Sequence, residues 1–124
     1  MEGLELAKAA ATLADDKRAE DIVILDLRGI STITDFFVIC TGTSNPHLKA
    51  IRTEIAGKLK EDGQKAYGTD GAPESNWLVL DYGDVIVHIF HQKQRQHYAL
   101  EDLWSDAPRV AVEFAPHGIA GATK

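Results

Sequence analysis

"NWLVLDYGDVIVHIF", residues 76–90, predicts a tight β-hairpin whose two strands are joined by Gly83 and Asp84. Side chains on a strand alternate between two faces, so this two-residue turn fixes which residues share a face. One face is then entirely apolar, and we expect it to meet the helices in the core. Its members are Leu78, Leu80, Tyr82, Val85, Val87 and Ile89.

The other face of the predicted hairpin mixes aromatic, acidic and imidazole side chains. The same register sets Trp77 opposite Phe90, Val79 opposite His88 and Asp81 opposite Ile86. This pattern admits three interpretations. It is typical of an ordinary half-exposed sheet face, of a protein-binding face with aromatic anchors and a carboxylate rim, and of a ligand or catalytic site.

The chain outside the hairpin predicts helices and strands that together form one α/β domain. A continuous run of branched apolar residues over 21–27 and another apolar run over 36–41 indicate buried strands. The fold class is therefore α/β, a single domain with one mixed β-sheet covered by helices, occupying residues 1–107. We expect residues 108–124 to form a flexible or loosely docked tail. Helices are predicted at 4–19 and from Ser44 or Asn45 to Gly63, a short strand at 64–67, a loop at 68–75 and helical turns around 98–104.

Composition restricts the classes of partner. The formal net charge is −6, which disfavours broad nucleic-acid binding. Between Lys65 and Lys93 the chain has acids but no Lys or Arg, which is typical of a solvated acidic loop or of a docking surface for a basic partner. The single cysteine, Cys40, and an N-terminus without a basic region before an apolar run favour a cytoplasmic protein.

Motifs for catalysis or metal binding are weak. The histidines lack metal-ligand spacing, so no metal, cofactor or catalytic residue is predicted. The stretch "TGTS", residues 41–44, follows a strand and precedes a helix, where anion-binding loops occur. It resembles the loop that opens the nucleotidyltransferase fold, but that chemistry needs paired acids on the next strand to hold Mg²⁺. A helix cap is the favoured interpretation.

Three segments resemble the ribosomal silencing factor RsfS family, also called the Iojap-like family. They are "DIVILDLRGISTITDFFVICTGTSNPHLKAI" (21–51), "NWLVLDYGDVIVHIF" and "HYALEDLW" (97–104), and the resemblance runs from residue 4 to 107. It implies a nucleotidyltransferase-like fold lacking catalytic acids, consistent with the missing acid pair. It also implies a non-enzymatic factor that binds the large ribosomal subunit through ribosomal protein L-fourteen. Such a factor obstructs joining of the small subunit and lowers translation when nutrients are short.

The resemblance also implies the partner-binding residues. The resemblance implies that Trp77 is a buried anchor of the contact and that Asp81 and Asp84 pair with Lys or Arg of the partner. It also implies that Val79 and His88 fill the contact patch and that Tyr98 borders this patch. Gly42 and Gly83 are structural turn residues.

Three alternatives stay open at this point. The chain is also compatible with a large-subunit assembly factor that does not silence. It is compatible with a nucleotide-binding or nucleotidyltransferase enzyme that uses the "TGTS" loop. The amphipathic sheet face also leaves open a homodimer of the free protein.

Overall fold

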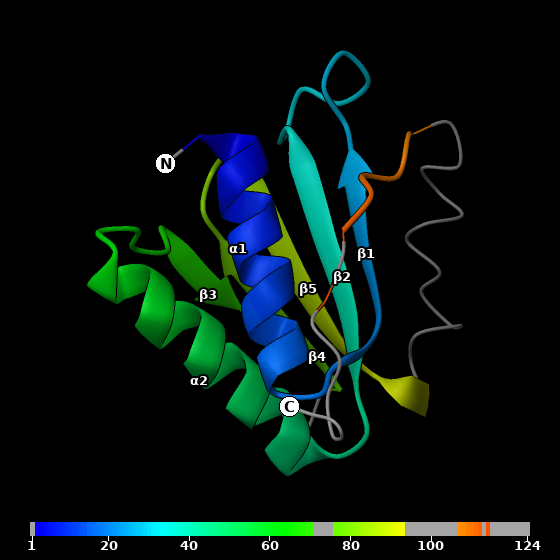
Figure 1. Ribbon diagram of the computed structural model, residues 1–124, viewed down its shortest axis with the longest axis vertical. Coiled ribbons are helices and arrows are strands. Elements are labelled where there is room, and N and C mark those ends of the chain that lie inside the picture. Colours follow the sequence, from blue (N-terminus) through cyan, green and yellow to red (C-terminus); the bar gives the residue numbers. More distant parts are fainter. Residues whose placement is uncertain (1, 71–75, 94–106, 113, 115–124) are drawn as a thin grey trace.

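Two helices cover one face of a five-stranded sheet (Figure 1). The computed structural model describes residues 2–70, 76–93, 107–112 and 114. The elements are α1 (Gly3–Asp16), β1 (Glu20–Asp26), β2 (Phe36–Gly42), α2 (Asn45–Glu61), β3 (Gly68–Asp70), β4 (Trp77–Asp81) and β5 (Val85–His91).

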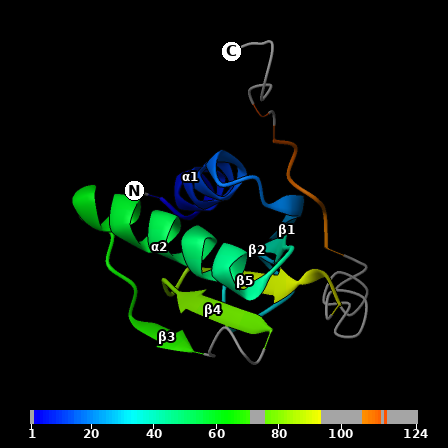
Figure 2. The same ribbon diagram turned by 90° about the horizontal axis from the view of Figure 1, so that it is seen from below.

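The sheet is mixed, as the sequence predicts. Its strand order is β1-β2-β5-β4-β3. The two central strands, β2 and β5, are parallel, and the other neighbours are antiparallel. Figure 2 shows α1 and α2 on the same side of the sheet. Neither of these two named helices lies on the opposite face of β4 and β5, which we call the helix-free face with reference to the described elements alone. The α/β class with one mixed sheet is confirmed, whereas the likeness to nucleotidyltransferases stays a prediction.

The hairpin has the predicted register. Trp77 pairs with Phe90, Val79 with His88 and Asp81 with Ile86. The apolar face points into the main core, together with buried residues of both helices. The side chains of Leu78, Leu80, Val85, Val87 and Ile89 are all fully buried, and Tyr82 is nearly so.

Helix α2 begins and ends close to the predicted positions. The Ser44 hydroxyl accepts a hydrogen bond from the His47 N–H at 3.2 Å and caps the first turn. The predicted apolar stripe is fully buried: Leu48, Ile51, Ile55 and Leu59. Helix α1 ends at Asp16, before the predicted position 19, because Arg18 leaves the helical region with a φ of 61°.

The short strand β3 lies at 68–70, where the sequence predicts a loop, and not at 64–67. Its pairing begins where the Tyr67 N–H donates to the Asp81 carbonyl at 2.7 Å. The open edge of β4 supplies these backbone partners, so a segment without apolar alternation becomes a strand. The helical turns predicted around 98–104 lie outside the described residues.

Residues 108–110 contact the edge strand β1. The Asp26 N–H donates to the Pro108 carbonyl at 2.8 Å, and the Val110 N–H donates to the Ile24 carbonyl at 2.9 Å. Val112 and Phe114 pack against the main core. The division of the chain at residue 107 stays a prediction. Within the described ranges, no helix is long and apolar enough to cross a membrane.

Candidate functional site

The helix-free face of the sheet carries a second, smaller hydrophobic cluster. Its buried members come from β1 and the residue that follows it, from β2 and β5, and from Ala107. The half-buried residues Val23, Trp77 and Ile86 pack against the cluster. The buried members are Leu25, Leu27, Phe37, Ile39, Phe90 and Ala107. The face is therefore partly a core, and on the hairpin its accessible part includes the half-buried side chains of Trp77, Val79, Asp81 and Ile86.

An aromatic cluster organises this face around His88. The Trp77 Nε1–H donates to His88 Nδ1 at 3.2 Å. The Trp77 ring stacks on Phe90 with centroids 5.2 Å apart, and Phe37 meets the imidazole edge-on at 4.6 Å. Indole can only donate, so Nδ1 must be an unprotonated acceptor and the imidazole proton is assigned to Nε2.

His88 is neutral at pH 7. Its side chain is only 7% exposed. Burial lowers the pKa of His88 to about 4, because a charged imidazolium ring at this buried position would lack hydration by water. Within the described part of the chain, the buried Nε2 atom has no hydrogen-bond partner. His88 thus lies beneath the face and orients Trp77.

The two acids predicted to meet a partner have different surroundings. The Asp81 carboxylate is half-buried, and its Oδ1 accepts from the Gly83 N–H at 2.8 Å. Asp84 is exposed, and its carbonyl accepts from Asp35 and Phe36 N–H groups, each at 3.0 Å. Its Cβ lies 3.5 Å from an ideal Cβ on Gly3, beside the start of α1, where the helix dipole favours a carboxylate.

The structure thus brings four of the predicted residues onto one face: Trp77, Val79, Asp81 and His88. Asp84 lies around the turn from them. Tyr98 lies outside the described residues, and its predicted place beside the patch stays a prediction.

At both predicted structural glycines an added Cβ would lie closer than 3.0 Å to a neighbouring side chain. Gly83 has a φ of +82°, and a Cβ there would lie 2.8 Å from Cε2 of Tyr67. Gly42 is buried, and a Cβ there would lie 2.6 Å from Cδ2 of Leu48. Gly83 therefore allows the turn and the Tyr67 contact, whereas Gly42 allows α2 to approach β2.

We expect Gly83→Ala to destabilise the protein more than Gly29→Ala. Gly29 has a similar φ of +79° but nothing within 4 Å of its Cβ position, so it isolates the cost of the backbone conformation. That cost is on the order of 1 kcal/mol. Gly83→Ala adds the displacement of the Tyr67 ring, and urea unfolding should show the larger loss. Equal losses would mean that Tyr67 swings away freely.

The "TGTS" loop is occupied by its own hydrogen bonds. The Thr43 N–H donates to His47 Nδ1 at 2.9 Å. Because Nδ1 accepts, the ring proton of neutral His47 lies on Nε2, which donates to the Lys17 carbonyl at 2.6 Å. With Ser44 capping α2, these bonds support the helix-cap interpretation over an anion cradle. Sequence analysis missed the link from His47 to the end of α1, because it joins residues 30 positions apart.

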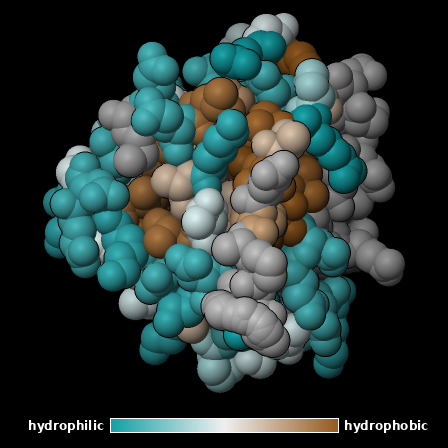
Figure 3. All heavy atoms as spheres, viewed as in Figure 1, coloured by the Kyte–Doolittle hydropathy of each residue, from teal (hydrophilic) through white to brown (hydrophobic). Residues whose placement is uncertain are grey.

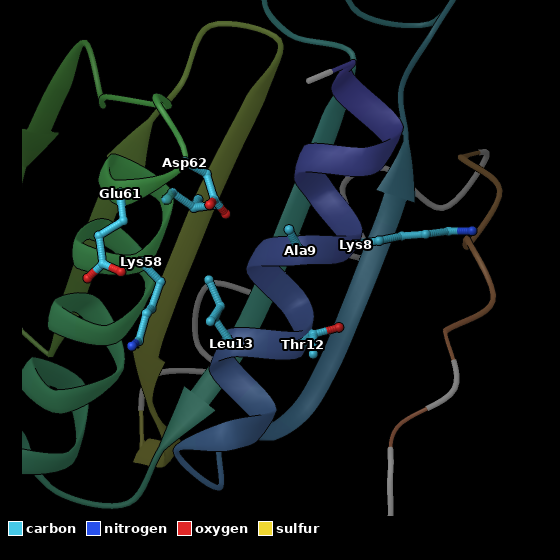
Figure 4. Close-up of a pocket in the computed structure, with 8 residues that line it drawn as sticks. Lys8, Ala9, Thr12, Leu13, Lys58, Glu61 and Asp62 are labelled. Atoms are coloured by element: carbon cyan, nitrogen blue, oxygen red, sulfur yellow. The ribbon is translucent and has the colours of Figure 1, made fainter.

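Two further features bear on ligand binding: clusters of metal-ligating side chains and the surface grooves. Across the described ranges, no group of three or more His, Cys, Asp or Glu side chains could hold a metal ion. A groove of about 420 Å³ lies between α1 and α2 (Figure 4). Leu13 points into the space between the helices, whereas Lys8 points away from it. The rim carries both charges, with Lys58 beside Glu61 and Asp62.

Fold and site together define a class of protein: a small α/β domain with helices on one side of a mixed sheet and an aromatic, acidic surface on the other. The sequence model of the family described as "Ribosomal silencing factor during starvation" matches residues 1–123. The chain belongs to this family, RsfS, as its resemblance predicts.

Individual relatives agree with this assignment. The Bacillus subtilis ribosomal silencing factor RsfS is 45% identical over 109 residues, covering 88% of this chain and 92% of the relative. The chloroplastic protein Iojap of Arabidopsis thaliana is 35% identical over 117 residues, 91% of this chain but 47% of that protein. A crystal structure from Bacillus halodurans superposes with a TM-score of 0.77 at 39% identity, covering 88% of this chain and 99% of that one.

Proposed function

We propose that the chain is a non-enzymatic translation repressor of the cytoplasm. It docks on the large ribosomal subunit through ribosomal protein L-fourteen and blocks joining of the small subunit when nutrients are short. The observation that carries this proposal is the family match over residues 1–123. Steric exclusion needs no turnover chemistry, in keeping with a "TGTS" loop in which the Thr43 N–H and the Ser44 hydroxyl oxygen already form hydrogen bonds with His47.

The helix-free sheet face supports this docking mode. It presents Trp77, Val79 and Ile86 as half-buried apolar groups next to the Asp81 carboxylate. A standard interface buries roughly 800 Å² per partner. The whole molecule exposes 6735 Å², so such a contact takes roughly an eighth of its surface.

Charge supports a basic protein as the partner. The formal net charge of −6 repels the phosphates of ribosomal RNA and attracts a Lys- and Arg-rich protein surface. Asp81 and Asp84 supply two carboxylates at the turn end of the hairpin. Asp81 also caps the turn, so part of its role is structural.

We expect the protein to co-sediment with purified large subunits on a sucrose gradient at physiological Mg²⁺. Adding it should reduce the peak of joined ribosomes when small subunits are present. Binding without a smaller joined peak would favour the assembly role. Protein that stays at the top of the gradient would contradict the proposed function and direct attention to a small ligand of the "TGTS" loop.

A homodimer of the free protein is the competing use of the same face. Two copies paired through Trp77 and Val79 would bury the groups that the ribosomal partner needs. Sedimentation velocity of the free protein separates the two states. If a dimer forms and dissociates when large subunits are added, the dimer is an inactive form of the factor that competes with binding to the ribosome.

A further inference from the structure

The strongly exposed large hydrophobic side chains among the described residues all lie on two segments that flank the β4–β5 turn. Ile30 is 43% exposed and Ile33 is 73% exposed, both in the connection between β1 and β2. Tyr67, just before β3, is 83% exposed. Figure 1 shows the β1–β2 connection standing beyond the strands at the top of the molecule, and Figure 3 shows hydrophobic colour there.

Both segments contact the same turn residue. The Thr34 hydroxyl donates to the Gly83 carbonyl at 2.9 Å, so the residue next to Ile33 contacts the turn. The Tyr67 ring also contacts Gly83, with its Cε2 atom 2.8 Å from the ideal Cβ position. We call this region the turn surface and define it by the two segments and the turn: Ile30, Ile33, Asp35, Tyr67 and Asp84.

The β1–β2 connection is ordered by its own hydrogen bonds. The Leu27 N–H donates to the Asp35 carbonyl at 2.8 Å, and the Ser31 N–H donates to the Leu27 carbonyl at 2.9 Å. The Ile33 N–H donates to the Ser31 hydroxyl at 3.1 Å. A partner that binds Ile33 therefore meets a preformed shape and loses little free energy in ordering the loop.

The charge of the turn surface selects the kind of partner. Asp35 and Asp84 lie on the segments that form it, and Asp81 adjoins it. The cation of the loop, Arg28, is held by Asp26 at 2.7 Å and lies over the Phe36 ring. Lys65 is the other cation on these segments. Carboxylates in excess repel phosphate groups and attract Lys and Arg.

We infer that the docking surface continues from the helix-free sheet face, over Asp81, onto the turn surface. The partner is a basic protein that places an apolar side chain between Ile33 and Tyr67 and sets Lys or Arg against Asp35 and Asp84. This inference rests on the proposed function, because Asp81 belongs to the face proposed to meet the ribosome. Ile33 and Tyr67 are then specificity residues that strand alternation alone does not identify.

The test compares Ile33→Ser, Tyr67→Ser and the double variant with Ala50→Ser. Ala50 is exposed on α2, on the opposite layer, so its substitution is the matched control. The measurement is the Kd for purified large subunits. We expect each turn-surface variant to bind at least about tenfold more weakly and Ala50→Ser to bind as the wild type. Melting temperatures should stay within about 2 °C, since exposed side chains contribute little to folding.

Three results would overturn the inference. If both turn-surface variants bind like the wild type while a sheet-face variant, Val79→Lys, loses binding, the partner stops at the sheet face and the proposed function survives. If the wild type does not bind large subunits, the proposed function fails and this inference fails with it. If the wild type is a dimer that Ile33→Ser or Tyr67→Ser converts to a monomer, a second copy occupies the turn surface.

Discussion

Val79→Lys should reduce binding to the large ribosomal subunit by more than about 100-fold. Val79 lies on the helix-free face opposite His88, between Trp77 and Asp81 on the same strand face. A lysine there sets a positive charge against a basic partner, and such like-charge contacts cost several kcal/mol. The folded state should tolerate the change, because Val79 is only half-buried and a lysine can extend its ammonium group into water.

Two further variants separate charge from shape and from position. Val79→Gln has a similar polar stem without the charge, and we expect a loss of about tenfold or less. Thr53→Lys adds the same charge at an exposed position on α2, on the other layer, and should leave binding unchanged. The measurement is the Kd at two salt concentrations. If Thr53→Lys abolishes binding and Val79→Lys does not, the helix layer is the docking side.

Strand alternation is enough to predict the hairpin register, because it depends only on neighbours in the chain and on a two-residue turn. That is why Trp77, Val79, Asp81 and His88 are found on one face as expected. Alternation does not predict what lies beside that face. The parallel pairing of β2 with β5 brings Phe37 next to His88, and no local pattern encodes this contact.

The missed features share this non-local origin. The short strand β3 consists of Gly, Thr and Asp, of which only Thr favours strands, and its pairing depends on the open edge of β4. The exposed Tyr67 is held over a glycine 16 positions away, so its role at the turn is invisible in the sequence pattern. In contrast, the helix cap is local, and the sequence predicts it at Ser44 or Asn45; the structure has it at Ser44.

The depressed pKa of His88 predicts that stability falls when the pH is lowered from 6.5 to about 4. Above pH 6.5 the imidazole is neutral in both the folded and the unfolded chain, so it contributes no pH dependence. Below pH 6.5 His88 is protonated in the unfolded chain, whereas in the folded protein it stays neutral until the pH reaches about 4. At 1.36 kcal/mol per unit, the free energy of unfolding falls by roughly 3 kcal/mol over this range.

The variant His88→Asn isolates this effect. Its side-chain oxygen can still accept from Trp77 Nε1, but it does not titrate. Urea unfolding at several pH values gives the difference in free energy between wild type and variant, in which the other histidines and the carboxylates cancel. We expect this difference to shrink by roughly 3 kcal/mol between pH 6.5 and 4. Parallel curves would mean that His88 titrates normally in the folded protein, and that the aromatic cluster admits a charged imidazole.

Protonation would also break the Trp77–His88 hydrogen bond, because Nδ1 then donates. A loss of large-subunit binding as the pH falls through about 4, absent in His88→Asn, would therefore tie the orientation of Trp77 to docking.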